Sequence, residues 1–235
     1  MMTKQYLQPA IQAFIASTLI VALLVLSYFI IEPQVGRAQD TSGPFTITQE
    51  IVGETSFIVD AVNTTLVGSL NGITGGTANG STTVVVQTNS PTGYTMDIAF
   101  FDNGTDNAML GSTTASESIR DYPSASGEPT YTFSTASTSA VFAYTVRADD
   151  SADLDDSFLN DNISACNSGL NVGATTTNCW MEPTVAAFQL IDRETDAPTG
   201  ATSTLHFRVH VPNNPTPGVV VDMYIATATL TVPPQ

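Results

Sequence analysis

Basic residues are scarce in this chain of 235 residues, which has six Lys and Arg against 22 Asp and Glu and a net charge of −16. No Lys follows Lys4, and from Gln39 onward four Arg stand against 21 acidic residues, a net charge of −17. Nucleic-acid binding depends on Lys and Arg that neutralise phosphates, so that function is excluded. The lack of Lys also excludes a Lys–Asn isopeptide bond and pilus polymerisation through a sorted Lys.

Catalytic motifs are missing as well. The nearest approach to a GxSxG nucleophile elbow, Gly68–Gly72, has its Ser in the wrong position, and the chain has no P-loop and no dinucleotide fingerprint. Its only cysteines, Cys166 and Cys179, are expected to form a disulfide in an exported chain, which leaves no thiol for Cys–His chemistry. We therefore expect no enzyme, and a secreted hydrolase ranks as a third class behind a structural protein and a binding module.

What the sequence does contain near its N-terminus is a long apolar run. Residues 10–31 carry no charge, Lys4 precedes them, and the small residues Gly36 and Ala38 stand before a potential cleavage point. A run of this length can also span about 30 Å of hydrocarbon. Residues 1–38 are therefore predicted to be a signal peptide cut after Ala38 or an uncleaved anchor that contacts the membrane through residues 10–31. In both cases the remainder is secreted or lies at the cell surface.

Beyond residue 38, helix signals are nearly absent, and Thr and Ser are abundant, with 35 and 20 residues in the whole chain. Apolar and polar residues alternate with period two between clusters of Gly, Asn, Ser and Pro. The pattern predicts about nine strands in an all-β fold, a β-sandwich of Ig-like or pilin-like type preceded by the apolar helix, with a barrel as the alternative. The expected strands are Phe45–Ile51, Ser56–Val62, Thr82–Thr88, Gly93–Phe101, Thr130–Thr135, Ala140–Arg147, Val185–Asp192, Thr202–Val211 and Val219–Val232.

Residues 39–235 are predicted to form a single extracellular domain, with two small domains as the alternative. The last two predicted strands are expected to pair across the turn-forming residues 212–218, with a bulge near Met223–Ile225 where the apolar phase changes. Asn71–Ser81 is expected to be a Gly-rich loop, and residues 149–183 are expected to be an insertion closed by the disulfide. In the chain-entropy model that bridge contributes about 3 kcal/mol.

An acidic run opens this insertion. Its five carboxylates could wrap a hard cation such as Ca²⁺, although their spacing is not that of an EF-hand and acidic loops are commonly just solvated. A second oxygen-rich turn spans Asp102–Asn107. The metal-ligand candidates of the acidic run are Asp149, Asp150, Asp153, Asp155 and Asp156.

Three other residues call for a choice between a structural and a binding role. His206 and His210 share one face of a predicted strand but lie roughly 13 Å apart, too far to ligate one metal, so we expect them on an exposed polar face. Trp180, beside Cys179, is either a ligand platform or a side chain that packs on the bridge.

Four asparagines, Asn63, Asn79, Asn103 and Asn162, stand in glycosylation sequons.

Several segments carry a resemblance to known proteins. They are Phe45–Gln49, Gly72–Ser81, Pro91–Met96, Asp121–Pro123, Tyr224–Val232 and the loop between the two cysteines. On these segments the chain resembles a group of uncharacterised secreted Thr-rich β-sandwich surface proteins of small-genome bacteria, a likeness that implies no activity. The closing strand, following Pro217–Gly218, is similar to that of pilin-like and Ig-like bacterial surface modules, which implies a sandwich presented outside the cell.

These observations lead to two functional hypotheses. The first is an exported structural or adhesive surface protein that self-assembles, with Phe45, Ile47 and Ile51 of an N-terminal strand filling pockets at the sheet edge of a neighbouring copy. The second is a monomeric module that binds a glycan or another surface protein, with Ca²⁺ ordering the acidic loop. Neither hypothesis requires a cofactor other than that calcium ion.

Overall fold

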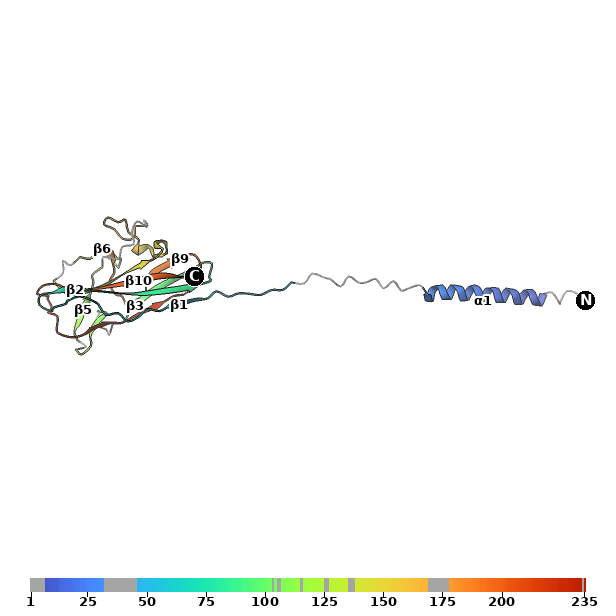
Figure 1. Ribbon diagram of the computed structural model, residues 1–235, viewed down its shortest axis with the longest axis horizontal. Helices are drawn as coiled ribbons and strands as arrows, with labels where there is room; N and C mark the ends of the chain where they lie inside the picture. Colours follow the sequence, from blue (N-terminus) through green and yellow to red (C-terminus); the bar gives the residue numbers. More distant parts are fainter. Residues whose placement is uncertain are drawn as a thin grey trace, which may run out of the picture. The chain divides into compact units, whose positions relative to one another are not determined.

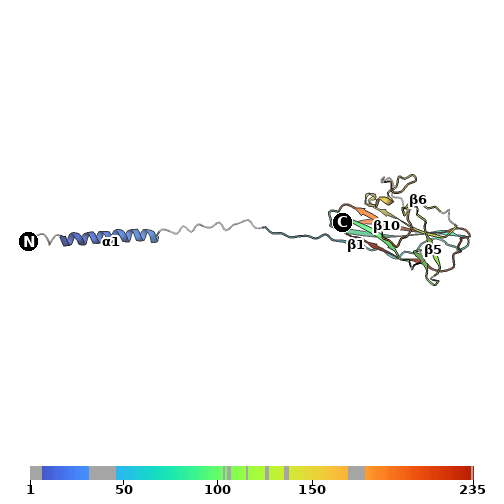
Figure 2. The same ribbon diagram turned by 180° about the vertical axis from the view of Figure 1, so that it is seen from behind.

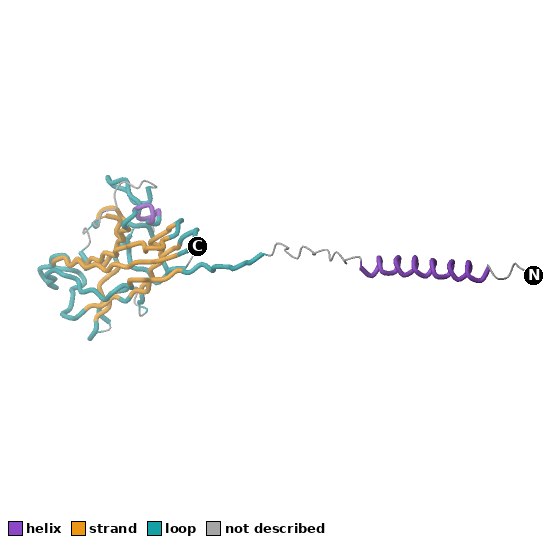
Figure 3. The backbone as a smooth tube through the Cα atoms, turned by 45° about the vertical axis from the view of Figure 1, so that its right-hand side comes forward, coloured by secondary structure: helices purple, strands orange, loops and turns teal. Residues whose placement is uncertain are grey.

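A computed structural model describes residues 7–31, 46–102, 104, 107–114, 116–124, 127–134, 138–168, 178–233 and 235 (Figure 1). The chain divides into two compact units, Met1–Glu50 and Ile51–Gln235. Figure 3 shows a helix in the first unit and mainly strands in the second. The protein is therefore mostly β, as the alternating pattern predicted.

The first unit contains α1 (Leu7–Ile31), which covers the apolar run. Over the part of the chain that the structure describes, no helix has the length and apolarity needed to cross a membrane. The predicted cleavage point after Ala38 and Phe45 of the predicted assembly strand both lie outside the described residues. Residues 46–54 form no strand, so the expected strand over Phe45–Ile51 is not found in its described part.

In the second unit the described residues form twelve strands rather than nine. They are β1 (Thr55–Val59), β2 (Gly76–Thr88), β3 (Tyr94–Phe100), β4 (Met109–Gly111), β5 (Ser118–Asp121), β6 (Thr130–Thr132), β7 (Val141–Ala148), β8 (Asn178–Trp180), β9 (Phe188–Arg193), β10 (Ala197–Val211), β11 (Tyr224–Ala226) and β12 (Ala228–Thr231). Seven form one sheet in the order β1-β2-β10-β7-β5-β4-β11, three form a second in the order β12-β3-β9, and β6 pairs with β8. The β5–β7 pair is parallel, and the other named pairs are antiparallel.

The main core draws its side chains from both larger sheets. Residues 94, 96, 98 and 100 of β3 are all buried, as their alternation predicted. In β10 the apolar face predicted over Leu205–Val211 packs into the same core, while His206, Arg208 and His210 lie on the other face. Figures 1 and 2 show β10 inside the sheet, where it is hydrogen-bonded to β2 and β7. The strict period-two segments thus fold as the sequence indicates.

A second, smaller core lies on the opposite face of β7. It contains Val141 and Ala143 of that strand together with Tyr122 and Trp180, and Phe133 packs against it. The residues from Val141 to Val146 are therefore buried on both sides of β7.

The predicted pairing of the last two strands is wrong. β10 pairs with β2 and β7, whereas β11 pairs with β4 in the seven-stranded sheet and β12 pairs with β3 in the three-stranded sheet. The change of apolar phase marks a crossing from one sheet to the other, because the strand ends at Ala226 and resumes at Ala228. No bulge in a continuous strand is needed to explain it.

The predicted Gly-rich loop is also partly wrong, because Gly76–Ser81 belongs to β2 and pairs with β10. Gly80 lies opposite Phe207 in this pair. A Cβ atom on Gly80 would lie 2.6 Å from Cδ2 of Leu66, so a glycine inside the strand allows the chain to pack closely there.

Candidate functional site

The acidic run folds into two short 3-10 turns, η1 (Ser151–Asp153) and η2 (Asp156–Phe158). The carboxylate of Asp150 accepts a hydrogen bond from the backbone N–H of Ala152 at 3.0 Å, and that of Asp155 accepts one from Ser157 at 3.0 Å. Both therefore cap a turn by satisfying a free N–H group, the role that Asp commonly has at such positions. Leu154 lies between the two capping residues and Phe158 follows them, and the buried side chains of both pack into the main core.

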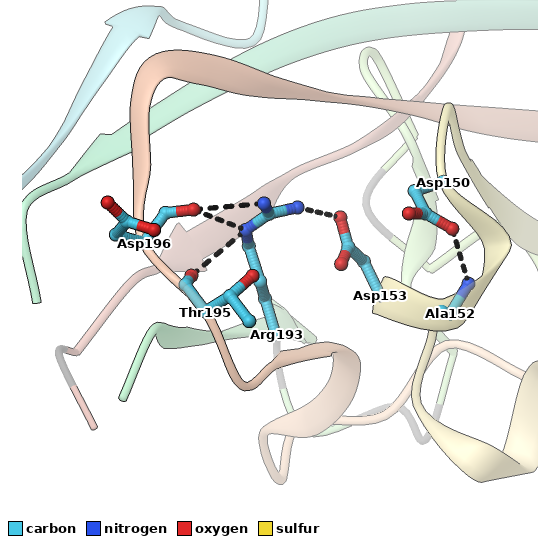
Figure 4. A network of polar contacts seen from close by, with 6 residues as sticks. All are labelled: Asp150, Ala152, Asp153, Arg193, Thr195 and Asp196. Carbon is cyan, nitrogen blue, oxygen red and sulfur yellow. Dashed lines mark hydrogen bonds and ion pairs between the residues drawn. The ribbon is translucent and has the colours of Figure 1, made fainter. Parts of the chain in front are cut away.

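Asp153 is held by Arg193 (Figure 4). Nη1 of Arg193 donates to the Asp153 carboxylate, while its Nε and Nη2 donate to the backbone oxygens of Thr195 and Asp196. The side chain of Arg193 is 19% exposed, and that of Asp153 is 12% exposed. Burial raises the pKa of Asp153, and the nearby charge and hydrogen bond of Arg193 act in the opposite direction. This contact joins the acidic insertion to the turn between β9 and β10.

These contacts bear on the predicted calcium ligands. Three of the five carboxylates cap turns or pair with Arg193, and Asp149 and Asp156 are exposed. Among the described residues, no three His, Cys, Asp or Glu side chains are grouped so as to hold a metal ion. In the second oxygen-rich turn, the carboxylate of Asp102 accepts from the N–H of Gly104 at 2.9 Å, while residues 103, 105 and 106 lie outside the described residues. The structure thus gives the acidic run a structural explanation.

The predicted disulfide between Cys166 and Cys179 is confirmed. It joins residues separated by 13 positions and links the middle of the 149–183 insertion to β8 near its end. Cys179 is buried in the main core, and the neighbouring Met181 forms a bridge with Tyr144 of β7. A disulfide is compatible with an extracytoplasmic location, where oxidising conditions preserve it.

Trp180 is only 1% exposed, so its ring is not itself an open ligand platform. It packs on Val141 and Ala143 of β7, and the guanidinium carbon of Arg208 lies 4.2 Å from its ring centroid. The same carbon lies 5.1 Å from the ring of Phe133, and Nε of Arg208 donates to Oδ1 of Asn79 at 2.7 Å. The sequence pointed to Trp180 but not to Arg208, the residue through which this cluster reaches the surface.

Both histidines lie on the same face of β10 as Arg208, as predicted, but they are half-buried rather than exposed. Nδ1 of His210 and Oγ1 of Thr77 are 2.9 Å apart and hydrogen-bonded. Burial, followed by the charge of Arg208, lowers the pKa of His210, and burial, followed by the charge of Arg147, lowers that of His206. We therefore expect both to be neutral at physiological pH, with the positive charge of this face held by the two arginines.

The segment predicted to assemble is exposed where the structure describes it. Ile47 and Ile51 are 84% and 83% exposed, in a stretch without strand hydrogen bonds of its own. Further exposed apolar side chains lie in or beside β11, one of the two edge strands of the seven-stranded sheet. They are Val220, Val221, Met223 and Ile225.

Comparison of the chain with protein-family models, curated proteins and solved structures finds no match in any of the three.

Proposed function

We propose that the chain is an exported, non-catalytic cell-surface protein with structural and adhesive roles, whose β-sandwich domains assemble by pairing of edge strands. The observation that carries the proposal is the coexistence of an exposed, isoleucine-bearing extended segment with a sheet edge, β11, that has exposed apolar side chains in and beside it. The two larger sheets share one core, which supports an Ig-like or pilin-like sandwich. The disulfide and the apolar helix near the N-terminus support export.

The donor in this assembly is the segment around Ile47 and Ile51. These side chains lie four positions apart and therefore on the same face of an extended strand. In β-strand addition, backbone hydrogen bonds supply affinity, and alternate side chains enter pockets of the acceptor. A donor of this kind has to be exposed and unpaired before assembly, and the described residues 46–51 meet both conditions.

The acceptor is the β11 edge of another copy. Natural sheet edges are usually protected by Lys, Pro or inward-pointing charges, because an open apolar edge pairs with other chains. This chain has no Lys after Lys4, and beside β11 Val221 is 99% exposed. Asp222 accepts hydrogen bonds from Ser112, Thr113 and Thr114. Its carboxylate therefore points to the neighbouring turn, where it does not repel a strand that approaches the edge.

Charge sets the condition for assembly. Two copies that each carry −17 after Gln39 repel each other at low ionic strength, and salt shortens the range of that repulsion to about 8 Å at 0.15 M. Edge pairing between copies is therefore expected to strengthen as salt is added. Contacts made by opposite charges would weaken under the same change.

The test is light scattering after size-exclusion chromatography of the 39–235 chain at low and physiological salt, with electron microscopy of any large species. Deletion of residues 39–52 and the variant Val221→Asp should each abolish ordered polymers and leave a folded monomer. Ile163→Asp is the matched control, since Ile163 is an apolar residue in the acidic insertion that is also well exposed, at 79%. Polymers that persist in the deletion variant, or are lost equally in the control, would refute strand exchange.

The alternative is a monomeric glycan-binding module with a calcium-ordered acidic loop. It predicts a rise in melting temperature with millimolar Ca²⁺. The informative variant is Asp149→Ala with Asp156→Ala, because these carboxylates are exposed and cap no turn. A calcium-induced shift that this double variant removes would favour the alternative over assembly.

A further inference from the structure

The outer face of the seven-stranded sheet has an unusual charge for this protein. We define the outer face as residues 77, 79, 81 and 83 of β2, residues 204, 206, 208 and 210 of β10, and Arg147 of β7. It contains two of the four arginines after Gln39 and both histidines of the chain, and no Asp or Glu. In a chain with 21 acidic residues after Gln39, the residues of this face thus present no carboxylate to an approaching anion.

Arg208 is the most distinctive group on this face. It is half-buried, and its guanidinium lies against Trp180 and Phe133 while Nε is held by Asn79. These two ring contacts and this hydrogen bond restrain the guanidinium, so less side-chain entropy is lost when it binds a ligand. Of the arginines in the described residues, Arg193 has a carboxylate partner within ion-pair distance, and Arg208 has none.

The surroundings of Arg208 are hydroxyl and amide groups. Thr83 and Thr204 form a hydroxyl pair at 3.1 Å, and Thr77 pairs with His210. The β2 side chains of the outer face are exposed, while β6 and β8 cover β7 next to it. The result is a hydroxyl-rich surface, exposed along β2, that contains the restrained guanidinium of Arg208.

We propose that the outer face binds an acidic saccharide, a sugar that carries a carboxylate. The guanidinium of Arg208 donates to the carboxylate, and the Thr and Ser hydroxyls and the Asn79 amide exchange hydrogen bonds with the ring hydroxyls. Arginine suits a carboxylate because its planar set of N–H donors matches the two oxygens. This site gives the protein an adhesive function that does not depend on edge-strand assembly.

A second copy of the chain is a less suitable partner for this face. Many of its carboxylates are already engaged within their own chain, including Asp153 with Arg193 and Asp161 with three backbone N–H groups. Two copies also bring two large negative charges together, whereas a sugar brings one charge for each carboxylate.

Trp180 makes the site observable without a label. It is the only Trp in the chain and lies beneath Arg208, so a ligand on the guanidinium should change its emission. The full chain, in a mild non-ionic detergent at low salt, is titrated with oligogalacturonate, and a neutral maltooligosaccharide of equal length is the control. We expect a saturable change with the acidic sugar alone, and weaker binding as salt is added.

Variants then assign the site. Arg208→Gln should weaken binding by at least about tenfold, the effect of one lost charge-assisted hydrogen bond. Arg208→Lys retains the charge and the side-chain stem and should bind with intermediate affinity, and Arg120→Gln, a change at an exposed arginine outside this face, should leave binding unchanged. Circular dichroism checks the fold of each variant.

Three results would overturn the proposal. One is the absence of a saturable change in the unmodified chain, or an equal change with the neutral sugar. Another is unchanged affinity in both Arg208 variants. The third is an emission change that follows protein concentration without added sugar, which would place a second copy on this face. Loss of polymers in the edge variants leaves this titration unaffected, so failure of either proposal is distinguishable from failure of the other.

Discussion

Replacing Arg193 by Gln should destabilise the fold in a way that depends on pH. The substitution removes the charge that faces Asp153 and the hydrogen bonds to the backbone oxygens of Thr195 and Asp196 (Figure 4). Breaking a fully buried pair by removing one partner costs about 3–5 kcal/mol. The side chains of Arg193 and Asp153 are still 19% and 12% exposed, so this pair is not fully buried. We therefore expect the free energy of unfolding to fall by about 2–3 kcal/mol at neutral pH.

The sign of the pH dependence follows from Asp153. Burial already raises its pKa in the folded state, and Arg193 limits that rise. Without Arg193 the pKa rises further, so the folded state binds a proton more tightly than the unfolded state. Stability then decreases as pH increases between the unfolded and the folded pKa values. The deficit of Arg193→Gln should therefore be smaller at about pH 4 than at about pH 7.

Urea unfolding followed by Trp180 emission measures the free energy of unfolding at both pH values. Adding Asp153→Asn to Arg193→Gln should recover part of the loss at neutral pH, because no charge is then left without a partner. The reasoning would be refuted by an equal deficit at both pH values, or by a double variant less stable than the sum of the single changes.

Three further predictions concern stability. Replacing Cys166 and Cys179 by Ala should lower the free energy of unfolding by about 3 kcal/mol, and reducing agent should bring the unmodified protein to a similar value in urea unfolding. An unmodified protein insensitive to reductant would contradict this. The hydroxyl of Tyr144 is buried and has no hydrogen-bond partner in the described structure, so Tyr144→Phe should cost less than about 1 kcal/mol or stabilise the fold, and a loss above about 2 kcal/mol would be inconsistent with it. Burial raises the pKa of Asp121 to about 6, so stability should fall as pH rises from about 4 to 6. Asp121→Asn should remove this slope and gain about 1 kcal/mol at pH 7 after allowance for partial exposure, and an unchanged slope in thermal melts would show the assignment to be wrong.

Period-two alternation predicted the strands whose faces differ most. Residues 94–100 and 205–211 alternate without interruption, and in both segments the predicted face is in the core. The pairing of β10 was not predictable in this way, since alternation gives the face of a strand and not its neighbour. β4, β5 and β8 have three or four residues each, too few for a periodic signal.

The candidate site was predictable only in its local parts. Capping by Asp150 and Asp155 involves an N–H two residues further along, and such contacts follow from sequence spacing. Asp153 and Arg193 are 40 positions apart, and the sequence around Asp153 does not indicate that Arg193 is its partner. Likewise, the alternation places Arg208 on a polar face, but its contact with Trp180 depends on how β8 folds back over β7.

The lack of lysine and the open sheet edge have one physical consequence in common. A protein that protects its edges with Lys prevents pairing locally, at the backbone groups that are free. This chain has the distributed repulsion of a net charge of −17 after Gln39, which keeps copies apart over a range set by salt. Repulsion of that kind leaves the apolar residues beside β11 available at short range. Solubility at low salt and edge pairing at higher salt are therefore compatible in the same sequence, without any conformational switch.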